Sequence, residues 1–554
     1  MQRIFIGVLL LFGMGTMDAL CDIVPKWATD QLHLRDIIHE SVRETQQWQQ
    51  EDGSIYPSYL SVYKWDDEVE IFYFWLDYYV LSGDESVYES AKGIALTYVR
   101  RGVESDRFDH GYYEEKFFDT EHTLEGMIIL ANLAWLRPDD EEVVSALEDV
   151  VEHAGNFVKE PGYEEWFVPE TSLMRSVRPG TREMDYNSWH AIDWVFNLQF
   201  VKMALATYYA TGNDRYLEWS QAYLDGWIDV LQRNKEENGF YIMPASVDPY
   251  TGNIGPYSGV WWESAFEPGW GWPEAGNNAQ RDMRGAFLDA YVLTGERQYL
   301  EALKQHVQTL FDNGSYYTPA HYYDGEAWIP EDDKVTAFMS SHIALLDEQI
   351  EPEFEEFMER WYDYQRYPDM ELHLWAYRKF GGEEKIDAIN ARAIDNAQKR
   401  LANIQALTEL PEEPDDFPTI GGYWGVTLVP FGGLASQRGE MPFKEVMYYD
   451  ANKSLGLPNG LAALFVTKDD SSKTFQVCNT TDALHTIWVQ NGFIKQAIRG
   501  VRVNGSEHTV LEDQLARIDI PANETVTVVL ETQQMDDIEP PGSPQRPMLF
   551  VKIR

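Results

Sequence analysis

Cysteine is almost absent from this chain, which carries only Cys21 and Cys478. Two cysteines cannot build a disulfide framework, and they are too few for a thiolate metal cluster. The 554 residues must therefore be held together by a hydrophobic core, for which 44% apolar and 14% aromatic residues are sufficient.

Basic residues are scarce as well. Lys and Arg together number 44 against 92 Asp and Glu, which gives a formal net charge of -48. Such a field repels a phosphate backbone, so the composition excludes a general nucleic-acid partner. The simpler interpretation of the charge is that it keeps the protein soluble.

Long apolar runs are missing except at the start of the chain. Residues 4–14, which follow Arg3, form an apolar run of about a dozen residues, too short to span a bilayer and typical of a signal peptide. We expect a signal peptide over 1–21 with cleavage near Ala19 to Cys21. The mature protein is then secreted, extracellular or periplasmic, with no membrane insertion.

Two familiar catalytic motifs are also lacking. The chain has no His-Glu-x-x-His pattern for zinc and no Gly-x-Ser-x-Gly elbow for a serine nucleophile. We therefore expect no metal centre and no cofactor. A calcium ion would find ligands only among the oxygens of the acidic C-terminal region.

What the sequence does contain is an internal repeat. Residues 211–218 (TGNDRYLE) recur as residues 294–301 (TGERQYLE), and a looser copy lies at 82–88. Each copy follows a long apolar stretch and precedes an amphipathic one, with Gly as a helix stop and a polar residue at the next start. The repeat predicts helical hairpins.

Six such hairpins can be counted between about Gln31 and Leu407. Their first helices are apolar around much of their circumference, as expected for helices walled in by others. A closed (α/α)6 toroid over 22–409 fits this number and the uneven spacing better than an open solenoid does. The six first helices are predicted to begin near Asp66, Glu121, Asn187, Asn278, Thr336 and Asp369.

The residue pattern of the sequence changes after Leu407. Residues 410–420 are a linker rich in Pro and acids, and from Gly421 short β-branched runs alternate with Gly, Asn and Asp turns. We expect a small antiparallel β-sandwich over 421–535 and a surface tail over 536–554. The fold class is mainly α, a toroid followed by a β-sandwich.

A secreted ring of helical hairpins with a trailing β domain resembles the six-hairpin carbohydrate-active enzymes. These include toroidal glycoside hydrolases and polysaccharide lyases that add a β-sandwich. The resemblance covers about four-fifths of the chain and rests on architecture. It implies an active site in a funnel at the N-terminal ends of the inner helices.

Those helix starts are rich in carboxylates and indoles. Capping explains a single acid at a helix start, but the whole set suits a sugar site, where carboxylates move protons and flat rings stack on pyranoses. The candidate residues at these starts are Asp66, Asp67, Asp119, Glu121, Asp282, Trp65, Trp189, Trp261 and Trp262, together with His122 and Arg281.

A basic island lies just upstream of the third helix start. Arg175, Arg178 and Arg182 fall within eight residues of an acidic chain. The guanidinium fork matches carboxylate or sulfate groups, so the island favours a uronate-containing or otherwise anionic glycan. The alternative is that these arginines pair with nearby acids such as Glu164, Glu165 and Glu170.

Two mechanisms compete for these residues, and a glycan-binding protein without catalysis is a third possibility. For hydrolysis we expect Asp67 and Glu121 as the acid and base, with Asp66, Asp119 and Asp282 as substitutes. For β-elimination, Tyr186 and His190 would act as proton carriers on one helix face, four residues apart, with Asn187 beside them. The latter trio is similar to the Asn, His and Tyr set of toroidal lyases.

A subset of the motifs is similar to the unsaturated glucuronyl hydrolases. These are Phe118-Asp119-Thr120 before one inner helix and Arg284-Gly285 on another. The resemblance implies an acid/base Asp five residues before Arg284, where this chain has Ala279. Vinyl-ether hydration would then require Asp282 to take that role.

Overall fold

The structure is a computed structural model. The residues that it describes are 24–56, 65–73, 75–104, 108–116, 119–187, 189–256, 259–262, 274–312, 343–344, 351–364, 370–412, 414–418, 439–442, 444–469, 471–492, 496–508, 511–512 and 514–534. The predicted signal peptide and tail lie outside these residues. None of the described helices combines the length and the apolar character that a bilayer crossing requires.

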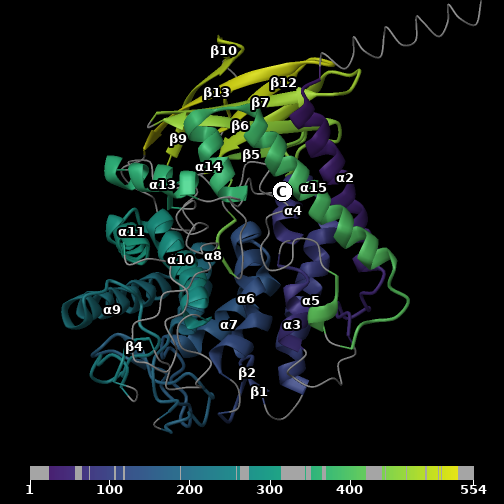
Figure 1. Cartoon of the computed structure of the whole chain (residues 1–554). Coiled ribbons are helices and arrows are strands. Elements are labelled where there is room, and N and C mark those ends of the chain that lie inside the picture. The colour runs from purple at the N-terminus through teal and green to yellow at the C-terminus, as the bar shows by residue number, and fades with distance from the viewer. Residues whose placement is uncertain are drawn as a thin grey trace, which may run out of the picture.

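Helices dominate the first four hundred residues (Figure 1). They are α2 (Lys26–Gln46), α3 (Trp65–Glu70), α4 (Trp75–Ser82), α5 (Glu85–Glu104), α6 (Thr120–Leu136), α7 (Glu141–Ala154), the 3-10 helix η2 (Val195–Leu198), α8 (Gln199–Thr211), α9 (Asp214–Asn238), α10 (Glu274–Thr294), α11 (Arg297–Asp312), α13 (Pro352–Tyr364), α14 (Met370–Phe380) and α15 (Glu383–Gln405).

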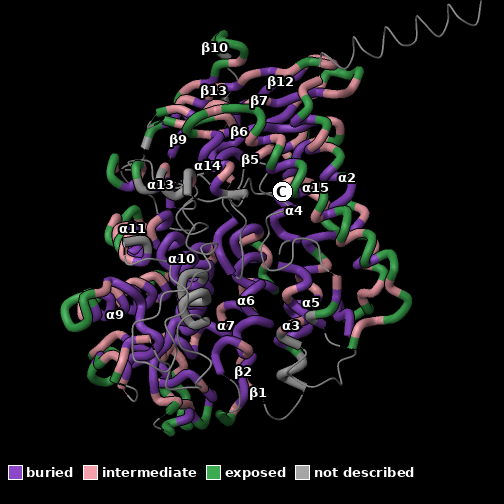
Figure 2. Tube along the Cα trace, in the orientation of Figure 1, coloured by how far each residue is buried: buried purple, intermediate pink, exposed green. Residues whose placement is uncertain are grey.

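These helices alternate between an inner and an outer layer. Every residue of α6 except His122 is buried, whereas α7 buries one face only. The inner helices α3, α6, α8 and α10 pack on one another in that order, and each hairpin pairs an inner helix with an outer one, as in α6 with α7 and α8 with α9. Figure 2 shows the buried inner layer and the partly exposed outer helices.

The ring closes through the first and last helices. Helix α15 packs along α2, and Gln46 at the end of α2 donates a hydrogen bond to Ser90 of α5 (3.2 Å). This closure confirms the toroid and excludes an open solenoid. The helix starts predicted near Asp66, Glu121, Asn278 and Asp369 agree with α3, α6, α10 and α14, and the start near Thr336 lies outside the described residues.

The C-terminal strands form the predicted β-sandwich. One sheet has the order β10-β9-β13-β7-β6 and the other β11-β12-β8-β5, all antiparallel. Apolar residues that face inward from both sheets, such as Phe475, Ile487 and Val528, form a core of their own. The strands are β5 (Val446–Tyr449), β6 (Leu461–Asp469), β7 (Ser472–Asn479), β8 (His485–Asn491), β9 (Gln496–Val503), β10 (Ser506–His508), β11 (Leu511–Glu512), β12 (Leu515–Ile520) and β13 (Thr525–Gln534).

A short segment before the sandwich, residues 439–442, reaches into the ring. Asn132 of α6 donates a hydrogen bond to the Glu440 carbonyl (2.7 Å) and accepts one from the Gly439 N–H (2.8 Å). From α10, Arg284 pairs with the Glu440 carboxylate (2.5 Å) and Asp289 accepts the Met441 N–H (3.2 Å). We call residues 439–442 the clip, because they connect two inner helices.

Candidate active site

Helix α6 begins with a carboxylate that has two tasks. Asp119 is the N-cap, and its side chain accepts the backbone N–H of His122 (3.2 Å), which satisfies one of the unpaired donors of the first turn. The same carboxylate lies 2.9 Å and 3.0 Å from Nδ1 of the His122 ring. A buried Asp is thus paired with a half-exposed imidazole at the start of an inner helix.

A second carboxylate–imidazole pair lies in the turn that follows the basic island. Nδ1 of His190 is 2.6 Å from Oδ2 of Asp185, and the backbone N–H of Asn187 donates to Oδ1 (2.9 Å). Burial alone would raise the pKa of Asp185, but the hydrogen bonds from Asn187 and His190 outweigh it and hold the pKa below its usual value. Asp185 is therefore a carboxylate at neutral pH.

The two pairs are connected through the backbone. The Thr120 N–H donates to the Val177 carbonyl (2.9 Å), and the Val177 N–H donates to the His190 carbonyl (3.0 Å). The Trp194 indole adds a hydrogen bond to the Thr120 hydroxyl (2.7 Å). These hydrogen bonds hold the start of α6 and the 185–191 turn together, with residues 173–177 between them.

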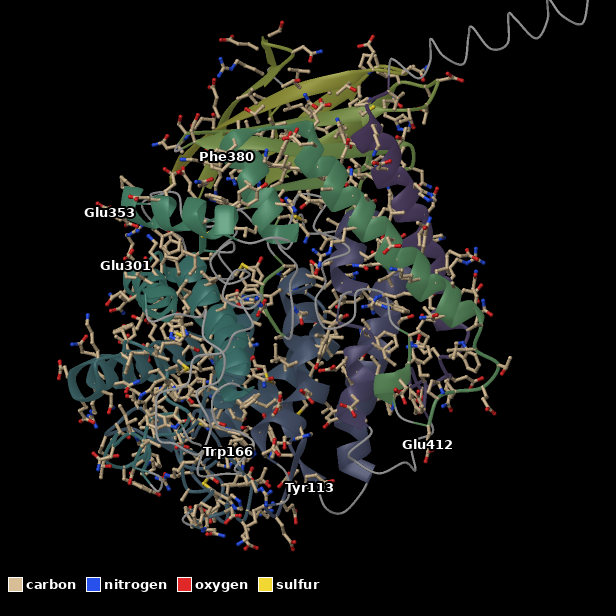
Figure 3. All side chains as sticks on the ribbon, viewed as in Figure 1. Tyr113, Trp166, Glu301, Glu353, Phe380 and Glu412 are labelled. Carbon is tan, nitrogen blue, oxygen red and sulfur yellow. The ribbon has the colours of Figure 1, made fainter. Side chains whose placement is uncertain are left out.

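This end of the molecule is marked in Figure 3 by Tyr113 and Trp166. The Tyr113 carbonyl accepts the Thr181 N–H (3.0 Å), and the Trp166 indole donates to the Gly180 carbonyl (3.1 Å). Those contacts fix the loop that carries the arginines between the small hairpins β1–β2 (Phe108–Asp109 and Tyr112–Tyr113) and β3–β4 (Phe167–Val168 and Leu173–Met174).

Two aromatic side chains next to His190 are exposed. Tyr186 is 49% and Trp189 is 55% exposed, in a protein whose other large rings are mostly buried. The Tyr186 hydroxyl donates to Oε2 of Glu164 (2.6 Å), and burial together with this carboxylate raises the pKa of Tyr186 to about 12. Tyr186 thus keeps its proton at neutral pH and is a poor base. Exposed rings beside acid and imidazole groups provide surfaces on which sugar rings can stack.

The two carboxylates predicted for hydrolysis come from neighbouring helices. Asp67 is half-buried in α3, and Glu121 is 7% exposed in the first turn of α6. The two helices pack side by side, and the Tyr73 hydroxyl just after α3 donates to the Glu125 carbonyl of α6 (2.6 Å). The adjacent Glu68 has a structural role, because its carboxylate accepts the backbone N–H groups of Ile55 and Tyr56.

Other predicted residues occupy structural positions. Asp282 is fully buried and pairs with the equally buried Lys202 of α8 (3.0 Å). Trp261 is 1% exposed in an apolar cluster with Ile242 and Leu310, and Trp262 is partly buried against it. The side chains of Trp65, Asp66 and Arg281 lie outside the described part of the structure.

The basic island is largely neutralised by its neighbours. Arg175 pairs with Glu165 (3.2 Å), while Arg182 pairs with Asp109 (2.9 Å) and Glu114 (3.2 Å). Arg178 is half-buried, and its backbone N–H donates to the Ser176 hydroxyl (3.0 Å). For Arg175 and Arg182, the alternative interpretation of ion pairing with nearby acids is the one that fits.

The predicted helix start near Asn187 is wrong. Residues 189–192 form turns and bends, η2 begins at Val195, and α8 begins at Gln199. Tyr186 and His190 therefore do not share a helix face, although both belong to the same turn as Asn187, which is exposed. Asp185 and Glu164, which hold His190 and Tyr186, were not predicted, because no local spacing indicates those partners.

Asp193, the acid after this turn, is also enclosed. It is fully buried and accepts hydrogen bonds from the Met174 N–H (2.9 Å), Asn197 (2.8 Å) and Tyr223 (2.9 Å). Burial raises the pKa of Asp193 to about 7 despite these donors. Its surroundings leave it a structural role, tying the turn to α9.

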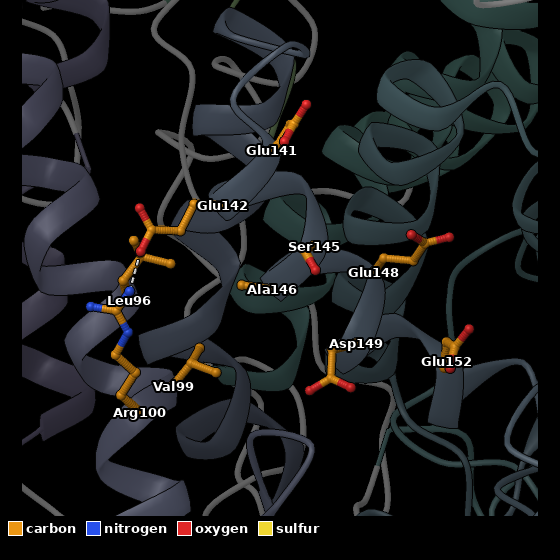
Figure 4. Close-up of a pocket in the computed structure, with 10 residues that line it drawn as sticks. All are labelled: Leu96, Val99, Arg100, Glu141, Glu142, Ser145, Ala146, Glu148, Asp149 and Glu152. Atoms are coloured by element: carbon orange, nitrogen blue, oxygen red, sulfur yellow. Dashed lines mark hydrogen bonds and ion pairs between the residues drawn. The ribbon is translucent and has the colours of Figure 1, made fainter.

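Two surface grooves in the described residues lie elsewhere, between outer helices. One, of about 770 Å³, runs between α5 and α7 and is lined by five acids and Arg100 (Figure 4). The other, of about 580 Å³, lies between α5 and the loop after α2. Arg100 pairs with Glu142 in both grooves, and this pair is a surface ion pair of the kind expected between solvated helices.

Metal ligands do not gather in the described residues, where no group of three or more His, Cys, Asp or Glu side chains is arranged to hold a metal ion. The start of α6 and the 185–191 turn carry carboxylates, imidazoles and exposed aromatic rings.

Comparison with known proteins gives one family and several distant structures. Residues 16–194 and 184–400 match the family model described as "Domain of unknown function (DUF8034)". No curated protein matches the chain.

The solved structures that resemble the chain are similar at low identity. The α-1,6-mannanase GH76A from Salegentibacter sp. HEL1_6 is 14% identical over 60% of this chain and 87% of that one, with a TM-score of 0.36. An unsaturated glucuronyl hydrolase specific for heparin is 12% identical over 63% and 88%, with a TM-score of 0.37.

Proposed function

We propose that this chain, which belongs to the family described as "Domain of unknown function (DUF8034)", is an enzyme that cleaves glycosidic bonds in an oligo- or polysaccharide. The observation that carries the proposal is the gathering of two carboxylate–imidazole pairs, Glu121 and two exposed aromatic rings at the N-terminal end of α6. Proton-transfer groups beside stacking surfaces are what glycosidic cleavage needs.

The proposed mechanism is carboxylate acid/base hydrolysis. Glu121 is nine-tenths buried in the first turn of α6, and we assign it the role of the acid that protonates the leaving oxygen. Asp67, on the adjacent helix and more exposed, suits the carboxylate that activates water or attacks the sugar. Asp119 is the substitute, whereas Asp282 is committed to Lys202.

We propose a glycan as the substrate. Whether that glycan is anionic or neutral is a question for the substrate panel. A uronate would have to compete with Glu165 for Arg175 and with Asp109 for Arg182. A neutral sugar faces no such competition. Both classes therefore belong in the substrate panel.

β-Elimination is the second candidate, and one observation favours it. Nδ1 of His190 contacts the Asp185 carboxylate, an arrangement that suits an imidazole that accepts a proton. The same turn carries Tyr186 and Asn187. Tyr186, with a pKa of about 12, would then donate a proton to the leaving oxygen and would not abstract one.

One incubation distinguishes the candidates. The purified chain is incubated with neutral glycans and uronate polysaccharides, and reducing ends and ultraviolet absorbance are followed together. New reducing ends without absorbance support hydrolysis, and absorbance of an unsaturated uronate supports elimination. Binding with neither signal indicates a glycan-binding protein and rejects the proposed enzyme.

We also propose from residues 4–14 that the protein is exported. Sequencing the N-terminus of the protein recovered from the native host tests this proposal.

A further inference from the structure

We propose that Asp185 is the positioning residue of this site, and that it fixes His190 as the imidazole that exchanges protons with the substrate. The proposal rests, for its chemistry, on the second of the two proposed functions, β-elimination, in which His190 accepts a proton, but its geometry stands alone. The side chains of Asp185 and His190 are 10% and 15% exposed, and 2.6 Å separates Oδ2 from Nδ1. A contact so short and so enclosed defines the orientation of the ring.

The two oxygens of Asp185 are occupied by different donors. Oδ1 accepts the Asn187 backbone N–H at 2.9 Å, and Oδ2 faces the ring. A carboxylate has no proton to give, so Nδ1 of His190 must be the donor to Oδ2. In the neutral ring, Nε2 is then the nitrogen that can accept a proton. Asp185 thus selects the ring tautomer.

The backbone of His190 is held as firmly as its ring. Its carbonyl accepts both the Val177 N–H (3.0 Å) and the Ser176 hydroxyl (3.0 Å). Val177 in turn accepts the Thr120 N–H, which ties the turn to the first residue of α6. The imidazole is therefore positioned relative to an inner helix and not carried by an independent loop.

Capping does not explain Asp185, in contrast to the other pair. Asp119 is the N-cap of α6, so its contact with His122 has a structural reason. Among the described residues after Asp185, the first helix is η2, which begins at Val195. The turn contact with Asn187 uses one oxygen, and the second oxygen is directed to His190.

The substitution Asp185→Asn inverts the arrangement. The amide oxygen must continue to accept the Asn187 N–H, so the amide NH₂ faces Nδ1 and donates to it. His190 is then driven to the form with its proton on Nε2, which cannot accept the substrate's proton. The change is isosteric, so the turn should keep its shape.

The tautomer can be measured directly in the whole protein without a substrate. In ¹⁵N-histidine-labelled protein, two-bond ¹H–¹⁵N spectra distinguish Nδ1–H from Nε2–H rings, and His190→Gln identifies the resonance. We expect His190 as the Nδ1–H form in the native chain and in Asp185→Glu, and the Nε2–H form in Asp185→Asn. Asp119→Asn is the matched control, and it should alter His122 and leave His190 unchanged.

Either of two results overturns the proposal. One is an unchanged His190 tautomer in Asp185→Asn. The other is an active native enzyme whose Asp185→Asn variant keeps kcat, where a loss of about 10²- to 10⁴-fold with KM little changed is expected. If the tautomer inverts but the native chain cleaves no glycan, the proposed function fails while the positioning of His190 by Asp185 is supported.

Discussion

The acids of the ring differ in what surrounds each of them, and this separates candidate catalysts from structural groups. Glu121 lies in the first turn of α6, which is hydrogen-bonded through Val177 to the turn that carries Tyr186 and Trp189, and Asp67 lies in the adjacent helix α3. Asp282 and Asp193 are fully enclosed by their partners. A carboxylate without access to substrate cannot act on it.

We expect Asp67→Asn and Glu121→Gln each to reduce glycan turnover by about 10²- to 10⁴-fold, since each removes one proton-transfer group. Far-ultraviolet circular dichroism and the thermal midpoint should stay close to those of the native chain. The matched control is Glu141→Gln, an exposed first-turn acid on the outer helix α7. Full activity of both test variants would rule out carboxylate hydrolysis by this pair.

For the Lys202–Asp282 pair we expect a substitution to lower the stability of the fold, in contrast to the substitutions of Asp67 and Glu121, which should lower turnover. Both side chains are fully buried, so Asp282→Asn removes the carboxylate that lies 3.0 Å from a buried ammonium and should destabilise the fold by about 3–5 kcal/mol. Urea unfolding measures this, and the double variant Lys202→Met with Asp282→Leu should recover most of the loss. An Asp282→Asn chain that keeps its stability but loses turnover would restore Asp282 as a catalyst.

At the scale of elements, most of the ring could be predicted from the sequence because inner helices are apolar all round. The third inner helix could not be placed correctly. Asp185 and Asn187 have the residue types of an N-cap, but the same side chains also form turns. Residues 189–192 form turns and bends, Asp193 accepts the Met174 N–H, and the first helical residue after them is Val195.

The partners of the arginines could be predicted from the sequence only in part. Arg175 finds Glu165 ten residues away, and Arg182 finds Asp109 seventy-three residues away. The first partner lies within reach of a local guess, whereas the second depends on the fold bringing β1 to this loop. An excess of acids predicts that partners exist but not which arginine each one meets.

The inner helices α6 and α10 depend on the clip for partners of their buried polar side chains. Asn132, Arg284 and Asp289 are buried, and each contacts residues 439–441. A chain cut to 22–409 leaves these groups without those contacts, and each buried polar group left unpaired costs roughly 1–3 kcal/mol. We expect the 22–409 fragment to lose cooperative urea unfolding, while a chain that ends at Gln534 keeps it. Equal midpoints for the two would show that the clip contributes nothing.

Across the whole molecule, one of the contacts between the toroid and the sandwich is built on a buried carboxylate. Glu445 is 6% exposed and lies 3.0 Å from Arg378 of α14, with Lys473 of β7 at 3.1 Å and Lys468 of β6 at 3.6 Å. Burial would raise the pKa of Glu445, but these three cations outweigh it and lower the pKa to about 2. The single acid therefore joins a helix of the ring to two strands of the sandwich.

That lowered pKa predicts an acid-sensitive junction. A carboxyl group whose folded pKa lies below its usual value of 4.5 stabilises the folded chain above that pH, and the contribution is lost as the pH falls toward 2. The shift corresponds to roughly 3 kcal/mol. Between pH 7 and pH 3 the native chain should therefore lose more stability in urea than Glu445→Gln, which is already destabilised at pH 7. The exposed pair of Glu531 with Arg502 (3.1 Å) provides the control, because Glu531→Gln should match the native chain at both pH values. If Glu445→Gln follows the native curve over the whole range, the junction does not depend on this charge.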